Sequence, residues 1–405
     1  MAGLAGLAVE KGHKVTGQDK AYYPPMSSQL KNLGINENLT EDISEDLKNC
    51  DLVIIGNSLS RGNKCVEYIL DKNLNYYSGP EWIKNFILKD KFVFVVSGTH
   101  GKTTTTSMLI KILKENGNDP SYLLGGIYQE DNISFKLTKS KYFIIEGDEY
   151  DTSFFDKRSK FVHYKPNTLI INNIEFDHSD IFEDISEIKK QFHYLIRTMS
   201  SKTNIVYKKD DKNIEDVLNM GFWSKVINFK KVDNIENIFG NHNLENAAAA
   251  ISAAESIGIN VESSLNALKK FSGVKRRLEL IETEKFTLYD DFAHHPTAVK
   301  ETLNAVSQKH PGKNINVFFE IRSNSMVAGT HKKNFYSSFI GANKVFIYSG
   351  KKIKWFEPTD KIKIFDNLDT IISEIISSTE NVDIVILMSN GDTSDIINKI
   401  KNHEK

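Results

Sequence analysis

Residues 91–115, KFVFVVSGTHGKTTTTSMLIKILKE, decide the fold. The segment opens with a short run of β-branched and aromatic residues, 92–96, which predicts a strand buried on both faces. A glycine-containing turn follows, and the apolar residues between 108 and 113 then fall on one face of a predicted helix. This order of strand, turn and helix predicts an α/β fold.

The turn has the composition of a phosphate-binding loop. Its glycines let backbone N–H groups point at phosphate oxygens, and the N-terminus of the next helix adds partial positive charge. We expect Lys102 to reach the outer phosphates and the Thr103 hydroxyl to ligate Mg²⁺. The common motif has a glycine where this chain has Val96, so the pattern is the shorter Gly-Thr-x-Gly-Lys-Thr. The alternative is a glycine-rich turn that binds nothing.

Length and composition restrict the class of protein. A chain of 405 residues is long enough for two to four domains, and 52 basic against 53 acidic residues give no argument for a nucleic-acid partner. Cys50 and Cys65 have no metal-binding spacing and indicate a reducing compartment. No apolar run is long enough to cross a membrane, and the N-terminus lacks the pattern of a signal peptide. We therefore expect a cytoplasmic protein, monomeric or weakly homo-oligomeric, with no membrane partner.

The first block of the chain, residues 1–88, has the pattern of a small α/β domain. It consists of a small-residue helix over 1–10, a strand ending at Asp19, a buried strand over 51–56 and helices over 63–71 and 81–88. A dinucleotide-type domain would have a strand and a glycine-rich turn before its first helix, so we interpret this domain as truncated at its N-terminus. Asp19 is either the acid that such domains carry at the end of the second strand or a residue that caps a turn.

The second and third blocks continue the alternation of strands and helices. In the second block a strand over 142–146 ends on Glu146, and another over 168–172 is followed by Glu175, Asp177 and His178. Ligands bind outside the carboxyl ends of parallel strands, so we expect these segments and the glycine-rich loop to converge on one site. The third block has strands over 286–290, 315–319, 345–348 and 384–388.

Several motifs occur in the order in which they are found in the Mur ligase family. They are Gly-Thr-His-Gly-Lys-Thr-Thr-Thr at 98–105, the strand ending at Glu146, Asn-Ile-Glu-Phe-Asp-His at 173–178, Gly-Asn-His-Asn-Leu-Glu-Asn at 240–246 and Val-Lys-Arg-Arg at 274–277. The chain resembles these ATP-dependent ligases, which join an amino acid or peptide to a UDP-sugar carboxylate, over nearly its whole length. A finer resemblance is to members that act on a tripeptide, and it lies in 23–27, 149–164, 176–182, 290–296 and 322–326.

The resemblance implies a fold and an activity. The fold would be α/β with three domains: a Rossmann-like UDP-binding domain (1–88), a central P-loop ATPase domain with a parallel sheet (89–272) and a Rossmann-like C-terminal domain that contacts peptide and ATP (273–405). The activity would be ATP-dependent ligation of L-alanyl-γ-D-glutamyl-meso-diaminopimelate to UDP-N-acetylmuramate through an acyl phosphate, in peptidoglycan recycling. The cofactors would be ATP and Mg²⁺.

The resemblance also assigns residues to roles. Lys102, Glu146 and His178 would be catalytic; Thr103 and Glu146 would hold one Mg²⁺, and Glu146 and His178 a second. The predicted ATP-binding residues are Gly98, Thr99, His100, Gly101, Lys102, Thr103, Thr104, His242, Asn243, Asn246, Arg277, Asp290 and Asp291. The predicted UDP-sugar contacts are Asp19, Asn57, Ser58 and Ser60, and the predicted peptide contacts are Arg322, Ser323 and Asn324.

Besides Asp19, four of these assigned residues have structural alternatives. Mg²⁺ prefers oxygen ligands, so His178 has the alternative of a hydrogen-bonded structural residue. The alternative for Glu146 is an ordinary acid at the end of a strand, and the alternative for Asn243 is a helix N-cap. The alternative for Arg322 is an exposed residue in a salt bridge.

The chain also departs from the family pattern. The segment 228–239 is short, the region of His193 lacks the lysine that several members carbamylate, and Gly391-Asp392-Thr393 replaces a turn richer in glycine. Three other functions remain open: a UDP-N-acetylmuramate–L-alanine ligase, an inactive ATP-binding relative and a folylpolyglutamate-synthase-like ligase.

Overall fold

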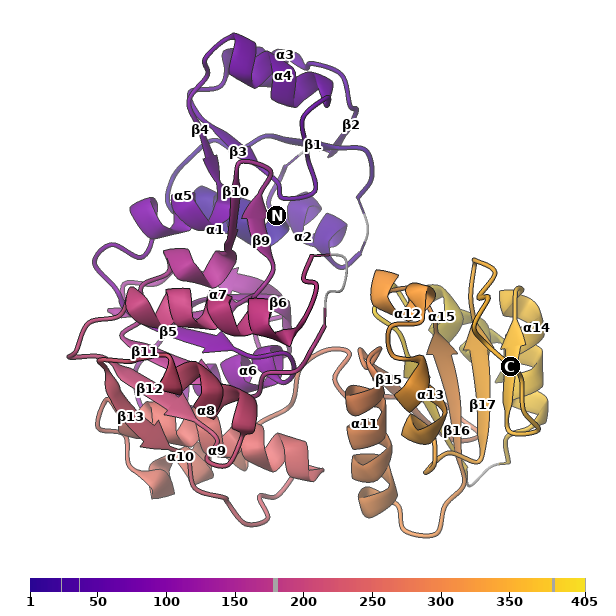
Figure 1. Ribbon diagram of the computed structural model, residues 1–405. Coiled ribbons are helices and arrows are strands. Elements are labelled where there is room, and N and C mark those ends of the chain that lie inside the picture. The colour runs from indigo at the N-terminus through magenta and orange to yellow at the C-terminus, as the bar shows by residue number, and fades with distance from the viewer. Residues whose placement is uncertain (23, 36, 178–180, 381–382, 405) are drawn as a thin grey trace. The chain divides into compact units, whose positions relative to one another are not determined.

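The computed structural model of the protein (Figure 1) describes residues 1–405 with the exception of 23, 36, 178–180, 381–382 and 405. The chain divides into two compact units. Unit 1 comprises 1–176, 181–232 and 246–271, and unit 2 comprises 177–180, 233–245 and 272–405.

The N-terminal part of unit 1 consists of short elements. Its helices are α1 (Ala2–Glu10), α2 (Met26–Asn32), α3 (Glu45–Asn49), α4 (Lys64–Asp71) and α5 (Gly79–Phe86). Its strands are β1 (Gly17–Asp19), β2 (Glu37–Leu39), β3 (Val53–Ile55) and β4 (Tyr76–Ser78), and they form the parallel pairs β1–β2 and β3–β4. Helix α5 begins with a capping box, in which Ser78 and Glu81 each satisfy a backbone N–H of the other.

The rest of unit 1 is built on one large sheet in the strand order β13-β12-β11-β5-β8-β6-β7. All neighbours in it are parallel except β6 and β7. The strands are β5 (Phe92–Ser97), β6 (Ser121–Tyr128), β7 (Ile133–Lys136), β8 (Tyr142–Gly147), β11 (Thr168–Ile171), β12 (Asn204–Tyr207) and β13 (Lys225–Asn228). The helices are α6 (Lys102–Glu115), α7 (Ile185–Arg197), α8 (Lys212–Asn219), α9 (Asn241–Glu255), α10 (Val261–Leu268) and the 3₁₀-helix η1 (Lys160–His163).

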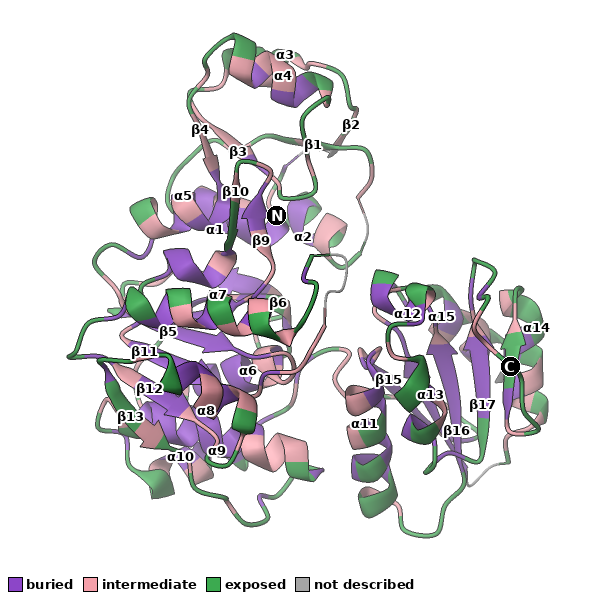
Figure 2. Cartoon of the chain, viewed as in Figure 1, coloured by how far each residue is buried: buried purple, intermediate pink, exposed green. Residues whose placement is uncertain are grey.

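The sheet core explains why the opening segment forms a central strand. Val93, Phe94, Val95 and Val96 are each at most 2% exposed, which requires cover on both faces of β5. Figure 2 shows β5 coloured as buried. Val93 and Val95 belong to one apolar cluster with residues of α5 and α7. A strand covered on both faces reads as a continuous apolar run, as in this sequence.

The N-terminal part of unit 1 is attached to the edge of the large sheet. Gly3 and Gly6 of α1 lie against Leu123 and Phe135, where an added Cβ would come within 2.6 Å of a side-chain atom. Gln29 Oε1 accepts hydrogen bonds from the backbone N and the Oγ of Ser134, both at 2.9 Å. Since β7 is an edge strand, these contacts cover backbone groups that would otherwise be open to pairing.

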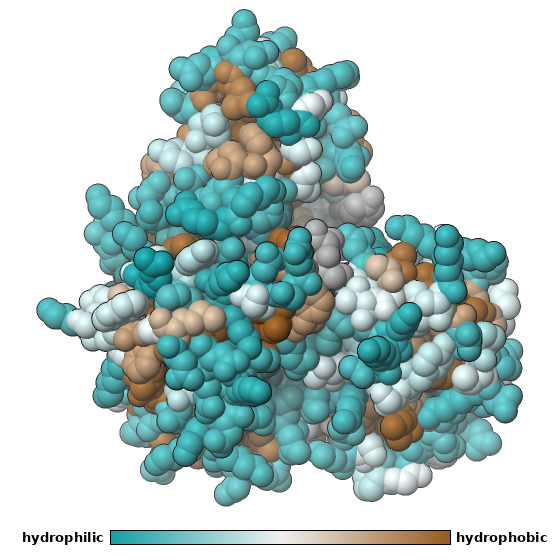
Figure 3. Space-filling view, in the orientation of Figure 1, coloured by the Kyte–Doolittle hydropathy of each residue, from teal (hydrophilic) through white to brown (hydrophobic). Residues whose placement is uncertain are grey.

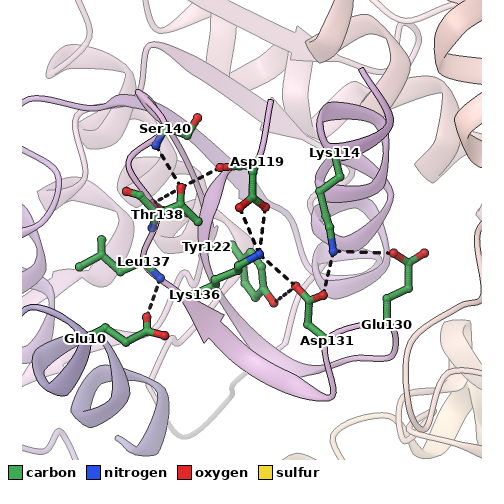
Figure 4. A network of polar contacts seen from close by, with 11 residues as sticks. Glu10, Lys114, Asp119, Tyr122, Glu130, Asp131, Lys136, Leu137, Thr138 and Ser140 are labelled. Carbon is green, nitrogen blue, oxygen red and sulfur yellow. Dashed lines mark hydrogen bonds and ion pairs between the residues drawn. The ribbon is translucent and has the colours of Figure 1, made fainter. Parts of the chain in front are cut away.

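A polar network continues this attachment beyond the end of β7 (Figure 4). Glu10 Oε2 accepts a hydrogen bond of 2.6 Å from the backbone N of Leu137. Asp131 accepts from Lys114 and from the hydroxyl of Tyr122, at 2.8 and 2.7 Å. Burial raises the pKa of Glu10 above its ordinary value, although the Leu137 N–H opposes this.

A hairpin of β9 (Asp151–Ser153) and β10 (Asp156–Ser159) rises from the large sheet towards β3 and β4 (Figure 1). Phe154 at its tip packs into the small apolar cluster of Ile55, Val66 and Ile69. Phe155 lies edge-on to Tyr76 at 5.1 Å between ring centroids. The hairpin therefore joins the core of the N-terminal part to the segment that follows β8.

Unit 2 is a six-stranded sheet in the order β14-β15-β19-β16-β17-β18, parallel except for β14. Its strands are β14 (Glu279–Ile281), β15 (Thr287–Asp291), β16 (Ile315–Glu320), β17 (Lys344–Tyr348), β18 (Ile362–Phe365) and β19 (Ile384–Met388). Its helices are α11 (Pro296–Lys309), α12 (Asn324–Ala328), α13 (Lys332–Ser338), α14 (Leu368–Ser377) and α15 (Ser394–Glu404). Val317 and Phe319 pack with α11 and α13, whereas Phe318 packs with α14 and α15. This alternation along β16 is what a sheet covered by helices on both faces requires.

Most of the elements expected from the sequence are present with small shifts. The strand expected to end at Asp19 is β1, which begins at Gly17, and the helix expected at 81–88 is α5, which begins at Gly79 and ends at Phe86. The strands that were not predicted from the sequence are β2, β4, β6, β7, β9, β10, β12, β13, β14 and β18. Among the described residues no helix is long and apolar enough to cross a membrane, and the face in Figure 3 is mainly hydrophilic.

We predict that Gly6→Val destabilises the protein by about 1–3 kcal/mol, a typical value for overpacking a core. A Cβ at Gly6 would lie 2.1 Å from Cζ of the buried Phe135 ring. Gly17→Val is the matched control, because a Cβ at Gly17 meets no atom within 4 Å, and we expect a change within about 0.5 kcal/mol. Denaturant unfolding measures both values, and equal stabilities of the two variants would show that α1 does not need glycine here.

Candidate active site

The loop between β5 and α6 has a backbone that only glycine fits comfortably. Gly98 and Gly101 have φ of +132° and +80°. A Cβ at Gly98 would lie 2.9 Å from the carbonyl oxygen of Asn173, and one at Gly101 would lie 2.3 Å from Oδ1 of Asn246. Both the conformation and the close approach therefore require glycine at these positions.

The segment after β11 holds the loop in place. The backbone N of Thr99 donates to the carbonyl of Asn173 at 3.2 Å, and the backbone N of His100 donates to Oδ1 of Asn173 at 2.8 Å. Thr99 and Glu175 exchange two further bonds through the threonine hydroxyl, at 2.8 and 3.2 Å. Glu175 also lies 3.6 Å from Nε2 of His100. The predicted convergence of the loop with residues 173–175 is thus present.

Lys102, the first residue of α6, is held by two oxygens. Its Nζ donates to the carbonyl of Gly98 at 2.7 Å and to Oε2 of Glu149 at 3.0 Å. Burial on its own would lower the pKa of Lys102, but the carboxylates of Glu149, Asp148 and Glu146 outweigh it and raise the pKa. The ammonium therefore stays charged although its side chain is only 14% exposed. The pairing of Glu149 with Lys102 was not predicted from the sequence.

Thr103 and Glu146 meet at the start of α6, as expected for a shared metal. Thr103 Oγ1 donates to Glu146 Oε2 at 3.1 Å, and Glu146 Oε1 accepts from the backbone N of Gly125 at 2.7 Å. A hydroxyl and a carboxylate are oxygen ligands of the kind that Mg²⁺ prefers, so this pair fits the predicted cation. His178, the other predicted ligand, lies outside the described residues.

Asn246 is the predicted adenosine-side residue that lies against the loop in unit 1. Its Oδ1 accepts from the hydroxyl of Thr105 at 3.1 Å and from Nδ2 of Asn172 at 3.4 Å. His242 and Asn243 belong to unit 2, in the first turn of α9. Asn243 Nδ2 donates to the carbonyl of Phe239 at 2.9 Å, so Asn243 is not the N-cap of α9. His242 Nδ1 lies 3.6 Å from Glu301.

In unit 2 the predicted residues lie at the carboxyl end of β15. Asp290 Oδ2 accepts from Arg276 Nε at 3.2 Å and from the hydroxyl of Thr393 at 2.8 Å. Asp291 accepts from the backbone N of Leu278 at 2.7 Å. Arg277, the predicted arginine, lies over the ring of Phe292 at 4.7 Å, and its neighbour Arg276 is the partner of Asp290. The Arg-Arg pair was visible in the sequence, but its spacing does not tell which member faces the acid.

The predicted peptide residues lie beyond β16. The Arg322 guanidinium is 57% exposed and 3.8 Å from Glu320. Ser323 is the N-cap of α12, accepting from the backbone N of Met326, and Asn324 is the first residue of that helix. This arrangement is compatible with the alternative of an exposed salt bridge and equally with the predicted contact between the guanidinium and the peptide.

The predicted UDP-sugar residues lie on the surface of the N-terminal part of unit 1. Asp19 is exposed at the end of β1, and its Oδ1 accepts from the backbone N of Lys20 at 2.7 Å. Asn57, Ser58 and Ser60 are exposed in the loop between β3 and α4. Their roles stay predictions.

We predict that Asp290 makes stability depend on pH. Burial raises its pKa from the ordinary 3.8 to about 6, against the opposing charge of Arg276, and its Oδ1 has no hydrogen-bond partner within the described residues. The folded state therefore binds a proton on Asp290 more tightly than the unfolded state does. The resulting contribution to the free energy of unfolding is complete below pH 3.8 and is lost as the pH rises through 6. The loss is at most about 3 kcal/mol.

Asp290→Asn should remove this dependence, because the amide has no proton to lose. Denaturant unfolding between pH 4.5 and about 7.5 measures it, with the exposed Asp360→Asn as the control. A variant whose stability falls with pH as steeply as that of the native protein would show that Asp290 ionises normally in the fold.

Comparisons with known proteins bear on the whole chain. Three family models match: "Mur ligase family, catalytic domain" at 1–91, "Mur ligase middle domain" at 96–235 and "Mur ligase, glutamate ligase domain" at 276–391. The UDP-N-acetylmuramate--L-alanyl-gamma-D-glutamyl-meso-2,6-diaminoheptandioate ligases of Haemophilus influenzae and Escherichia coli K12 are each 40% identical over 99% of this chain, covering 96% and 95% of their own length.

A solved structure agrees with these matches. The murein peptide ligase of Psychrobacter arcticus superposes with a TM-score of 0.76 at 33% identity, covering 100% of this chain and 96% of its own. The α/β architecture, the glycine-rich loop with Lys102 and the full-length identity agree with one another, and the chain belongs to the Mur ligase family.

Proposed function

We propose that this chain is the ATP-dependent ligase that joins L-alanyl-γ-D-glutamyl-meso-diaminopimelate to UDP-N-acetylmuramate. The observation that carries the proposal is 40% identity over nearly full length to two ligases with this activity in their names. We further propose the domains 1–88 for the UDP-sugar, 89–272 for ATP and 273–405 for peptide and ATP contacts. The reaction belongs to peptidoglycan recycling and takes place in the cytoplasm.

The chemistry needs ATP because a carboxylate does not react with an amine at neutral pH. The acceptor carboxylate takes the γ-phosphoryl group of ATP, which releases ADP and gives an acyl phosphate. The peptide amine then attacks the acyl carbon, the C–N bond forms, inorganic phosphate leaves, and the amine loses a proton. The first step is a phosphoryl transfer, in which positioning and charge neutralisation are the main tasks of the protein.

The residues of the loop suit these tasks. Lys102 supplies a fixed positive charge at the outer phosphates, and Glu149 keeps it in place before the nucleotide enters. Thr103 and Glu146, together with His178, would hold Mg²⁺, which neutralises phosphate charge when bound. Asn246, which supports the loop through Thr105, is proposed to contact the nucleoside.

We predict that phosphate release from ATP requires both UDP-N-acetylmuramate and the tripeptide. Coupled phosphate detection measures this, with L-alanine in place of the tripeptide as the second arm. A rate with alanine above that with the tripeptide would favour the alanine ligase, and rapid hydrolysis of ATP alone would exclude a ligase.

Lys102→Ala should lower kcat by about 10²-fold or more, because a charge that stabilises the transition state is removed. Lys114→Ala is the matched control in the same helix, and its lysine pairs with Asp131 away from the loop. A kcat for Lys102→Ala above about a tenth of the native value would place Lys102 outside phosphoryl transfer.

Arg322→Lys should raise KM for the tripeptide about tenfold, because a guanidinium binds a carboxylate with two parallel hydrogen bonds and an ammonium does not. The peptide offers several carboxylates. Steady-state kinetics measure the effect, and KM for ATP should barely move. Unchanged KM values for both would support the salt-bridge alternative for Arg322.

A further inference from the structure

Lys160 is, like Lys102, a partly buried lysine near the phosphate loop, and none of the roles above uses it. It is the first residue of η1, directly after the β9–β10 hairpin, and its side chain is 19% exposed. Its backbone N donates to the carbonyl of Tyr150 at 3.1 Å, which fixes the base of the hairpin. Its Nζ lies 3.9 Å above the ring of Tyr150.

The charge of Lys160 is only loosely compensated. Within the described part of the chain its ammonium approaches Asp148 Oδ2 to 3.8 Å, beyond hydrogen-bond distance. Lys102, by contrast, reaches Glu149 at 3.0 Å. Burial lowers the pKa of Lys160, and the carboxylates of Asp148, Asp151 and Glu149 do not fully offset it. An ammonium with three donors in such surroundings gains from an anionic ligand.

The position of Lys160 lies between two predicted sites of the same unit. Among the charges that act on Lys160, that of Lys102 lowers its pKa, so the two ammoniums lie near one another. On the other side, burial lowers the pKa of the Met1 amino group, Lys160 lowers it further, and Asp19 raises it. Lys160 thus stands between the phosphate loop and the end of α1 near Asp19.

We propose that Lys160 binds an anionic oxygen of the UDP-sugar acceptor, either its carboxylate or its pyrophosphate. The inference rests on the function proposed above, in which the acceptor must extend from the N-terminal part of unit 1 to the loop. The β9–β10 hairpin fixes the position of Lys160. Phe154 packs the tip of the hairpin into the core of the N-terminal part of unit 1, and the base of the hairpin lies at Asp148 and Glu149. Lys160 is a positioning residue: it orients and neutralises the acceptor that Lys102 and ATP then activate.

The test is calorimetric binding of UDP-N-acetylmuramate without ATP to the native protein, Lys160→Met and the control Lys157→Met. Lys157 lies in the same hairpin, is 72% exposed and pairs with Asp151. We expect Lys160→Met to raise Kd about tenfold or more, the effect of losing a charge-assisted hydrogen bond. We expect the Kd of Lys157→Met to stay within about twofold of the native value. We also expect both variants to keep KM for ATP within about twofold of the native value.

UDP-N-acetylglucosamine, which lacks the lactyl carboxylate, distinguishes the two anions. Weakening confined to UDP-N-acetylmuramate identifies the carboxylate, and equal weakening of both sugars identifies the pyrophosphate. Lys160→Arg should restore affinity in part because it keeps the charge, and it also serves if Lys160→Met fails to fold.

Two results would overturn the inference. One is an unchanged Kd for UDP-N-acetylmuramate in Lys160→Met. The other is a parallel loss of ATP and UDP-sugar binding that Lys160→Arg shares, which would mean that Lys160 only supports the hairpin. If the native protein itself does not bind UDP-N-acetylmuramate, the proposed function fails first, so the two failures are distinguishable.

Discussion

The parallel pairing of β5 with β8 on one side and β11 on the other is the constraint on which unit 1 depends. In this register Ser97 lies opposite both Gly147 and Ile171, so the three strands end at the same level. The residues that follow them therefore leave the sheet side by side. Asn173 and Glu149 need to stand only two residues beyond their strand ends to reach the loop, and they do.

That convergence could be predicted from the sequence because each strand is an unbroken apolar run that ends at a polar residue. The positions of Lys102, Thr103, Glu146 and Glu175 followed from it. The strands that were missed have weaker signals. Strand β6 contains Gly125 and Gly126, and β9 and β10 are short and polar, so neither alternation nor an apolar run marks them.

Contacts between distant segments were also beyond prediction. The hydrogen bonds of Gln29 with Ser134 and of Glu10 with Leu137 join residues more than a hundred positions apart. Each links a side chain to a backbone N–H, of Ser134 within β7 or of Leu137 directly after it, and any polar side chain of suitable length could make such a bond. In unit 2 the choice between Arg276 and Arg277 as the partner of Asp290 depends on the backbone, since Arg276 has a φ of +60°. A sequence pattern does not contain that angle.

The acids around the loop need a physical explanation, because their carboxylates would repel a bound phosphate. Glu146, Asp148 and Glu149 all follow or end β8, and only two ammoniums, Lys102 and Lys160, lie among them in the described residues. Without these acids, however, burial would lower the pKa of Lys102, and a neutral amine would not attract phosphate. Glu149 thus preserves the charge that the loop later presents. Glu146 has a different task, since its bonds to Thr103 and Gly125 hold its carboxylate facing the hydroxyl with which it would share a cation. The acidic surplus therefore fits the proposed binding of ATP together with Mg²⁺, whose charge would neutralise both the carboxylates and the phosphates.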